Sequence, residues 1–491
     1  MICVTIGRRT VSEMVGEQRR LAAAGAQLCE FRLDHLEPPI DMAELFAKRD
    51  GPVVITFRRP EDGGVRQVDE SYRRRLLKDA MQAGAEYVDL EEDAAAAIPR
   101  VGSARRIVSL HDFTSTPSDL SAIHARLASR DADLVKIAAR ANTTHDVTRV
   151  LRLVRTAGLP TVAFCMGELG TPSRLLAGRC GAPFTYACAA TGEALAPGQL
   201  SFSELVELYH YDQIGPRTEL YGVIGDPIAH SRSPLVHNAA FRSLGLDKVY
   251  LPFRVPADDL GRFLADAPEL ELQALSVTIP HKEAVLAAVT DPDDAVREIG
   301  AANTLVWGHD RLYGFNTDQA AAIDSLAAAI ESAPEATAPL AGLRALVLGA
   351  GGAAKAIVHG LLAAGAEVLV SSRTFARAEQ ISAAIGGRAL AWEMRYEPRV
   401  DVLVNCTPLG MSPHVQATPF DGQYLLPGMI VFDTVYNPET TLLVEEARRQ
   451  RCTVITGVEM FVRQAARQFR HFTGMGPPLE LMRQTLRANA E

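Results

Sequence analysis

Short apolar runs of strand length recur through the first part of the chain, and segments rich in alanine, leucine and arginine separate most of them. This alternation predicts parallel strands joined by helices. Eight strands of this kind predict a (β/α)8 barrel over residues 1–214. The predicted strands are Ile2–Ile6, Leu28–Leu33, Val53–Phe57, Tyr87–Glu91, Arg106–His111, Leu134–Ala138, Thr161–Met166 and Phe184–Cys188. The clearest predicted helices are Val11–Ala24, Tyr72–Ala83 and Asp146–Ala157.

Several predicted strands carry polar residues on one face. Successive strand side chains point to opposite faces, so Glu30 and Arg32 share a face, as do Ser109 and His111. These positions lie near the carboxyl ends of the strands, where barrel enzymes hold their active sites. Buried charges are costly unless they bind something, so the pattern predicts a catalytic site.

Lys136 lies inside the apolar strand Leu134–Ala138, a pattern that normally excludes a charge. Burial there disfavours the ammonium and favours the neutral amine that a Schiff base requires. The alternative is a lysine held in a buried ion pair without a chemical role.

A set of short motifs follows in order along this half: Glu30–Asp34, Thr56–Arg58, Ser109–Phe113, Lys136–Ala138, Ser173–Gly178 and Ala196–Gln199. Together they resemble the type I 3-dehydroquinate dehydratase family. The resemblance implies that Lys136 forms an imine with the substrate ketone and that His111 transfers the protons. It implies that Arg174 holds the substrate carboxylate, with further substrate contacts from Glu30, Arg32, Arg58 and Gln199.

Two positions depart from the family pattern. Asp62 stands before Gly63-Gly64 where the family usually has glutamate, and we expect this shorter acid to orient His111 less closely. Leu195 replaces a serine before Ala196–Gln199, which removes one hydroxyl contact from the substrate lid. Both changes affect the expected rate more than the reaction.

The second half begins after Gly215-Pro216 with a second set of strands and helices. Ser233-Pro234, read as a serine cap followed by proline, is a helix-start signal. These features predict a separate α/β domain over residues 219–330. An alanine- and proline-rich connector, 331–342, precedes the next domain. The predicted strands are Tyr221–Gly225, Val249–Phe253, Leu275–Ile279 and Asn303–Trp307.

Residues 340–459 carry the pattern of a Rossmann-like dinucleotide domain. Strand Ala345–Leu348 leads into a glycine-rich turn, 349–354, and then an alanine-rich helix, a context suited to a pyrophosphate. The next strand, Val368–Val370, precedes Arg373 and Arg377 instead of an acidic residue. An arginine pair favours a 2′-phosphate, so we expect NADPH rather than NADH.

Another ordered set of motifs comprises Gly225–Pro234, Val277–Lys282, Gly300–Thr304, Asn316–Asp318, Asn405–Met411, Asp433–Pro438 and Gly457–Gln464. This set resembles the shikimate dehydrogenase family over about residues 219–491. The resemblance implies that residues 219–330 form a substrate-binding domain, to which the C-terminal helices 460–491 return. The resemblance implies Lys282 and Asp318 as the catalytic pair, because ketone reduction needs a proton donor beside the developing alkoxide. The implied substrate-binding residues are Ser231, Ser233, Thr278, Asn303, Tyr436 and Gln464. The expected cofactor-binding residues are Gly349, Ala350, Gly351, Gly352, Ala353, Ser372, Arg373, Thr374, Arg377, Thr407, Thr434 and Gly457.

This half also departs from its family at two positions. Ser276 replaces the usual asparagine before Val277, which we expect to loosen a substrate contact. Glu459 stands where glycine is common, and we expect it near the nicotinamide, where it alters the fit of the cofactor.

Composition narrows the classes of partner. A chain of 491 residues is too long to fold around a single hydrophobic core, so several domains are expected. The net charge of −9, without a block of basic residues, disfavours nucleic acid as a partner. No apolar run approaches the roughly 20 residues of a membrane span. Seven scattered cysteines without C-x-x-C argue against disulfides and zinc, so we expect no metal. Met1–Gly7 resembles a strand rather than a signal peptide, so we expect a cytoplasmic location for a monomer or homodimer.

The two resemblances together imply consecutive steps of the shikimate pathway, because the product of the first domain is the substrate of the second. Two alternatives stay open. One is a regulatory homologue with weak or no catalysis, against which the chain retains His111, Lys136, Lys282 and Asp318. The other is an NAD-dependent quinate or shikimate dehydrogenase in the second half, which the arginine pair disfavours.

Overall fold

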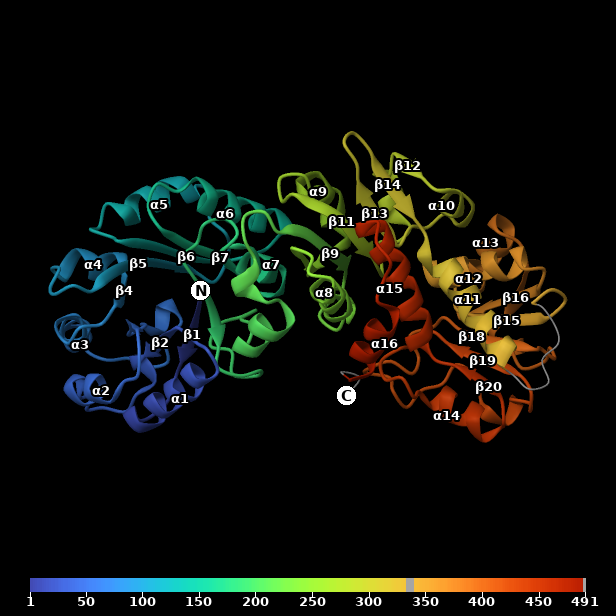
Figure 1. Cartoon of the computed structure of the whole chain (residues 1–491), viewed down its shortest axis with the longest axis horizontal. Helices are drawn as coiled ribbons and strands as arrows, with labels where there is room; N and C mark the ends of the chain where they lie inside the picture. Colours follow the sequence, from blue (N-terminus) through green and yellow to red (C-terminus); the bar gives the residue numbers. More distant parts are fainter. Residues whose placement is uncertain (333–339, 489–491) are drawn as a thin grey trace. The chain divides into compact units, whose positions relative to one another are not determined.

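Figure 1 shows the computed structural model, which describes residues 1–332 and 340–488. Contacts divide the chain into two compact units, Met1–Glu219 with Asp247–Glu271 and Leu220–Leu246 with Leu272–Glu491. The predicted connector 331–342 falls largely outside the described residues, because 333–339 are not described.

Eight parallel strands form a nearly closed barrel, which confirms the predicted fold of the first half. Their order is β7-β6-β5-β4-β3-β2-β1-β8. The strands are β1 (Ile2–Ile6), β2 (Leu28–Arg32), β3 (Val53–Thr56), β4 (Tyr87–Glu91), β5 (Arg105–Asp112), β6 (Leu134–Arg140), β7 (Thr161–Met166) and β8 (Thr185–Cys188). The helices outside them are α1 (Val11–Ala23), α2 (Met42–Lys48), α3 (Glu70–Gln82), α4 (Glu92–Ala97), α5 (Leu120–Ala128), α6 (Thr144–Thr156) and α7 (Thr171–Leu176).

The barrel interior is divided into an apolar part and a polar part. The first side chain of several strands that points into the barrel is apolar and belongs to one buried cluster with Phe184. These side chains are Leu28, Val54, Ile107 and Leu134. Two residues further along the same strands, the inward positions become polar. Because all strands run in parallel, the apolar groups gather at one end of the barrel and the polar groups at its carboxyl end.

A six-stranded mixed sheet with the order β10-β9-β11-β13-β14-β12 follows. β11 ends at Val277, two residues before the predicted end, where the chain approaches Pro280; a proline has no N–H for a sheet. β13 and β14 form an antiparallel hairpin, of which the sequence predicts only β13, because β14 has only four residues and contains Gly314. The strands are β9 (Glu219–Gly225), β10 (Lys248–Arg254), β11 (Leu272–Val277), β12 (Asp291–Pro292), β13 (Thr304–Trp307) and β14 (Leu312–Phe315).

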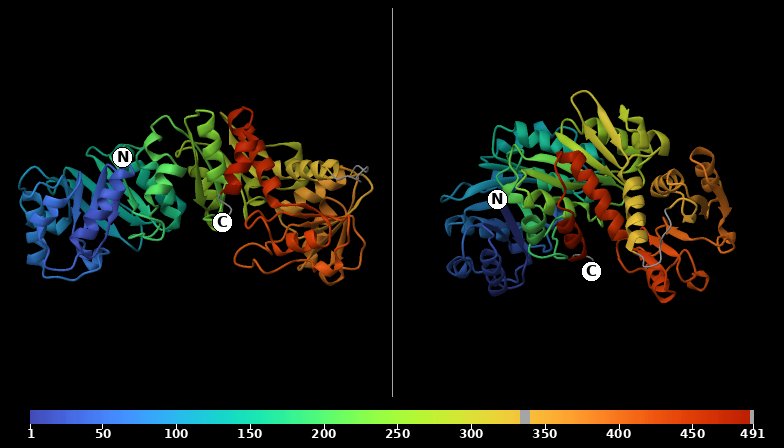
Figure 2. Two further views of the ribbon diagram at one scale, coloured as in Figure 1. Left: turned by 60° about the horizontal axis from the view of Figure 1, so that its bottom comes forward. Right: turned by 45° about the vertical axis from the view of Figure 1, so that its right-hand side comes forward.

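Helices cover this sheet, and those at the C-terminus contact helices from earlier in the chain. α15 and α16 pack against α8, and α15 also packs against α11 (Figures 1 and 2). In α8, Ser233 is the first helical residue rather than the cap, which is Arg232. The helices are α8 (Ser233–Ser243), α9 (Leu260–Asp266), α10 (Asp294–Ile299), α11 (Thr317–Ser332), α15 (Gly457–Thr473) and α16 (Leu479–Ala488).

The third sheet is parallel and has the order β17-β16-β15-β18-β19-β20. This is the Rossmann order, in which the strand sequence reverses direction between β15 and β18. The predicted Rossmann-like fold is confirmed. Its elements are β15 (Arg344–Leu348), α12 (Gly352–Ala363), β16 (Glu367–Ser372), α13 (Phe375–Ala384), β17 (Arg388–Ala391), β18 (Val402–Asn405), β19 (Ile430–Asp433), α14 (Leu442–Arg449) and β20 (Thr453–Ile455).

Two candidate active sites

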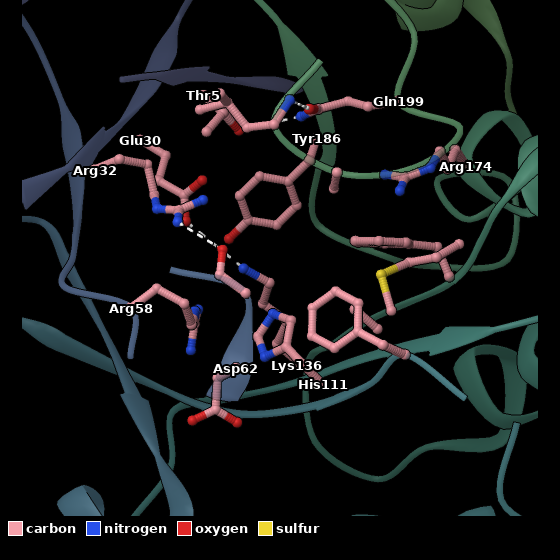
Figure 3. Close-up of a pocket in the computed structure, with 17 residues that line it drawn as sticks. Thr5, Glu30, Arg32, Arg58, Asp62, His111, Lys136, Arg174, Tyr186 and Gln199 are labelled. Atoms are coloured by element: carbon pink, nitrogen blue, oxygen red, sulfur yellow. Dashed lines mark hydrogen bonds and ion pairs between the residues drawn. The ribbon is translucent and has the colours of Figure 1, made fainter. Parts of the chain in front are cut away.

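A cavity opens at the carboxyl end of the barrel strands, and all eight residues predicted for the barrel site line it (Figure 3). In Figure 3, Lys136 and His111 lie between Arg32 and Arg58 on one side and Arg174 and Gln199 on the other. The eight are Glu30, Arg32, Arg58, Asp62, His111, Lys136, Arg174 and Gln199. Thr5, Phe113, Phe164 and Tyr186 also line the cavity and were not predicted.

Lys136 lies in this cavity and is also ion-paired. Its Nζ lies 2.9 Å from Asp89 Oδ2 and 3.6 Å from Glu30 Oε1, and its side chain is only 5% exposed. The nitrogen also lies 4.1 Å from the ring centre of Tyr186. The ion pair that the sequence offered as an alternative is therefore present, but it coexists with access to the cavity.

Asp89 on β4 is the main residue that the sequence analysis missed. Its carboxylate is fully buried, lies 2.8 Å from Arg58 Nη2 and accepts a 2.5 Å hydrogen bond from Ser109 Oγ. Burial alone would raise the pKa of Asp89, but Arg58 and Lys136 hold it well below its usual value. Tyr87, Asp89 and Glu91 alternate with apolar residues, so strand parity was the signal that could have revealed it.

His111 is a buried imidazole beside Lys136. Burial, and next the positive charge of Arg58, lower its pKa well below the usual value. Its Nδ1 has no hydrogen-bond partner within the described residues. A neutral imidazole with an open nitrogen is suited to accept a proton from a substrate in the cavity.

Asp62 lines the same cavity but does not bond to His111. Its carboxylate accepts a 2.8 Å hydrogen bond from Arg59 Nε, and burial raises its pKa. Together with the open Nδ1 of His111, this geometry leaves the expected orienting contact unformed.

Arg174 on α7 is a buried cation without a carboxylate partner in the described chain. Its guanidinium stacks on Phe164 at 4.2 Å, and Nη2 donates to the Pro197 carbonyl at 3.2 Å. Nε and Nη1 have no partner in the described residues, and burial lowers the pKa of Arg174 to about 10. An open guanidinium fork facing a cavity suits a carboxylate of a ligand.

The second candidate site brings Lys282 and Asp318 together. Lys282 Nζ donates to Asp318 Oδ2 at 2.6 Å, and both side chains are largely buried. The glycine-rich turn also reaches this pair: a Cβ added at Gly352 would lie 3.1 Å from Lys282 Cδ. A dinucleotide bound at that turn would therefore lie beside the lysine.

The predicted substrate residues of this half come from separate segments. Asn303 accepts from Thr317 N and donates to Thr317 Oγ1, directly before Asp318. Ser231 Oγ accepts from Ser233 N at the start of α8. Tyr436 packs on Phe461 at 4.6 Å between ring centres, and Gln464 Nε2 donates to the Phe461 carbonyl. Thr278 lies at the end of β11, where Thr278 N donates to the Ile224 carbonyl.

The predicted cofactor residues follow the carboxyl edge of the Rossmann sheet. Gly349 has φ +115°, and an added Cβ would lie 2.8 Å from the Cys406 carbonyl oxygen, so this turn requires glycine. Thr407 and Thr434 both bond to Asn405 at the end of β18. The distribution of the predicted cofactor residues fits a dinucleotide that lies across the point between β15 and β18 where the strand order reverses. The turn after β15 holds Gly349, Ala350, Gly351, Gly352 and Ala353, the end of β16 holds Ser372, Arg373, Thr374 and Arg377, and Gly457 follows β20.

Ser276 and Glu459, the two positions of this half that depart from the family pattern, both contact other protein side chains. Ser276 Oγ donates to Gln468 Oε1 of α15 at 2.8 Å. Glu459 lies 3.0 Å from Arg483 and 3.4 Å from Arg487, both on α16. Glu459 therefore joins the two C-terminal helices.

We expect Glu459→Gly to lower the thermal stability of the protein while the KM for NADPH stays within about twofold. These ion pairs are partly exposed, so their loss costs roughly 1 kcal/mol or less, with a further small cost for glycine in a helix. Thermal unfolding and steady-state kinetics measure both quantities. A several-fold change in KM with unchanged melting would instead place Glu459 at the cofactor.

The described residues offer neither a metal site nor a membrane span. They contain no group of three or more His, Cys, Asp or Glu side chains arranged to hold a metal ion. None of their helices combines the length and apolar character that a membrane span needs. The expectation that neither reaction uses a metal stays a prediction.

The geometry defines a class of protein: a lysine-centred barrel site joined to a dehydrogenase-like Rossmann site on one chain. Family models agree with this division. The model described as type I 3-dehydroquinase matches residues 2–216, and that of the shikimate dehydrogenase substrate binding domain matches 223–305. The model for an NADP oxidoreductase, coenzyme F420-dependent, matches 345–435, and the shikimate 5'-dehydrogenase C-terminal domain matches 457–487.

Individual relatives cover one or both halves. The chloroplastic bifunctional 3-dehydroquinate dehydratase/shikimate dehydrogenase of Arabidopsis thaliana is 37% identical over 98% of this chain and 83% of its own length. A Thermus thermophilus shikimate 5-dehydrogenase, solved with NADP(H) and shikimate, is 35% identical over 56% of this chain and all of its own, with a TM-score of 0.50. A shikimate dehydrogenase solved with NADP+ is 30% identical over 57% of this chain and 98% of its own, with a TM-score of 0.53. The chain belongs to the family of bifunctional 3-dehydroquinate dehydratase/shikimate dehydrogenases.

Proposed function

We propose that the barrel dehydrates 3-dehydroquinate to 3-dehydroshikimate and that the second half reduces this product to shikimate with NADPH. The observation that carries the proposal is the barrel cavity, where an amine, a neutral imidazole and an unpaired guanidinium face one space. This set matches a ketone that also bears a carboxylate and an acidic C–H. The Lys282–Asp318 pair beside the glycine turn supports the second step.

In the barrel, Arg174 binds the substrate carboxylate and Lys136 forms an imine with the ketone. The imine makes the neighbouring C–H acidic, so neutral His111 removes the C2 proton. Because burial, and next the positive charges of Arg58 and Lys136, disfavour a charged imidazole, His111 readily gives this proton to the departing hydroxyl. The carboxylates of Asp89 and Glu30 offset the positive charge on the imine nitrogen.

In the second half, the residues at the carboxyl edge of the Rossmann sheet fit a dinucleotide. A Cβ added at Gly351 would meet nothing within 4 Å, so the turn leaves room for a pyrophosphate at the start of α12. Arg373 and Arg377 follow β16 and have no ion-pair partner in the described residues. NADPH would supply the hydride. Lys282 donates a proton to the ketone oxygen as it becomes an alkoxide, and Asp318 holds Lys282 in place.

Arg373→Ala should weaken NADPH binding by about 1.5–3 kcal/mol and leave NADH binding nearly unchanged, because a charged hydrogen bond to the 2′-phosphate is lost. Titration of both cofactors measures the difference. Arg388→Ala is a matched control. Arg388 begins β17, so it lies at the amino-terminal end of the parallel strands, whereas Arg373 follows the carboxyl end of β16. Equal losses for NADPH and NADH would show that Arg373 does not contact the 2′-phosphate.

A coupled assay tests the overall proposal. Purified protein with 3-dehydroquinate should form 3-dehydroshikimate and then consume NADPH faster than NADH. A regulatory homologue would show weak activity or none in both reactions, and an NAD-dependent enzyme would prefer NADH. The division into domains at 1–214, 219–330 with 460–491, and 340–459 stays part of the proposal. So do a cytoplasmic location, a monomeric or homodimeric state, and small molecules rather than nucleic acid or membrane as partners.

A further inference from the structure

Tyr186 on β8 places an unpartnered hydroxyl in the barrel cavity. The residue is only 3% exposed, and its hydroxyl has no hydrogen-bond partner in the described residues. Leaving a buried hydroxyl without a partner costs free energy, so native proteins rarely retain one without a reason. Its ring covers Lys136, with Nζ 4.1 Å from the ring centre.

The other cavity residues with unpartnered buried atoms already have proposed partners in the substrate. Within the described chain, the cavity-lining side chains with such atoms are His111, Arg174 and Tyr186. His111 faces the proton to be moved, and Arg174 faces the carboxylate. The hydroxyl of Tyr186 points into the cavity near the ends of Lys136 and Glu30 (Figure 3). The hydroxyl of Tyr186 is therefore available for a hydrogen bond at the point where the substrate ketone must meet the amine of Lys136.

We propose that Tyr186 is a further catalytic residue, which donates a hydrogen bond to the oxygen of the ketone that Lys136 attacks. This proposal rests on the proposed dehydratase function. The oxygen gains negative charge when the lysine nitrogen bonds to its carbon, and a donor placed there stabilises that charge.

The chemistry of the step balances without a further reactant. The nitrogen of Lys136 forms a bond to the ketone carbon, while the oxygen takes up two protons and leaves as water. Overall, an ammonium and a ketone become a protonated imine and one water, and the net charge does not change. Tyr186 stays protonated throughout, since burial raises its pKa well above the usual value, and it acts as a hydrogen-bond donor that is not consumed.

Tyr186→Phe tests this role with a small change in shape. We expect kcat of the dehydratase to fall on the order of tenfold or more, the scale for a donor to a developing charge, while KM changes less. Borohydride trapping should show slower imine formation on Lys136. The melting temperature should stay the same or rise, because the variant removes a buried polar atom without a partner. Shikimate oxidation should not change.

Tyr211→Phe is the matched control, because Tyr211 is also a buried barrel tyrosine and lies outside the cavity lining. It should leave dehydratase kinetics unchanged. Unchanged kinetics in Tyr186→Phe, or equal kinetic losses in both variants, would overturn the proposal. A marked drop in the melting temperature of Tyr186→Phe would assign the hydroxyl a structural role instead. If the unmodified protein dehydrates nothing, the proposed function fails first, and that result is distinct from failure of the role of Tyr186.

Discussion

Replacing Lys136 with alanine or methionine should abolish dehydration of 3-dehydroquinate, with a loss on the order of 10³-fold or more. Among the described residues, Lys136 is the only lysine that lines the cavity and could form the imine. Borohydride added with substrate to the unmodified protein should attach the ligand to Lys136. Mass spectrometry of peptides identifies the labelled residue. Labelling elsewhere would contradict the Schiff-base assignment.

Two controls separate chemistry from stability in these variants. Lys136 neutralises Asp89 and Glu30, so its removal leaves buried carboxylates short of a partner and destabilises the barrel. Lys136→Met keeps most of the side-chain volume, and unfolding curves show what fraction of the variant is folded. Shikimate oxidation should persist in both variants. Dehydration by a folded Lys136→Met variant would rule out the lysine as the nucleophile.

Strand parity explains why much of the barrel site could be predicted from the sequence. Glu30 with Arg32, and Ser109 with His111, recur at positions that face one way on parallel strands. Since parallel strands bring their carboxyl ends to one rim, such residues must converge, and Glu30, Arg32 and His111 line the cavity. The family motifs then supplied the residues from loops and helices, such as Arg174 and Gln199, which no periodicity connects to the strands.

The contacts between these residues could not be predicted in the same way. Asp89 and Glu91 alternate like the recognised positions, yet only the barrel geometry shows that Asp89 joins Lys136 to Arg58. The pairing of Asp62 with Arg59 depends on the path of one loop. Glu459 contacts a helix that begins about twenty residues later, so its partner depends on the packing of α16 rather than on local sequence.

The reduction should depend on Lys282 and Asp318 as one unit. Their 2.6 Å contact joins the segment after β11 to the start of α11, and each is needed to present a proton to the substrate oxygen. We expect Lys282→Ala and Asp318→Ala each to lower turnover about 10²-fold or more, the scale of general acid catalysis. The double variant should be little slower than the more damaged single variant, because either change already removes the assembled donor.

Steady-state reduction of 3-dehydroshikimate by the three variants tests this coupling, and dehydratase activity should persist in all of them. Asp324→Ala is a matched control, because Asp324 is another ion-paired carboxylate of α11, bonded to Arg467. It should retain nearly full turnover. Losses that multiply in the double variant would give Lys282 and Asp318 independent roles, since residues that act separately contribute additive free energies to the barrier. The proton donor would then be the lysine alone, with Asp318 contributing to the site in another way.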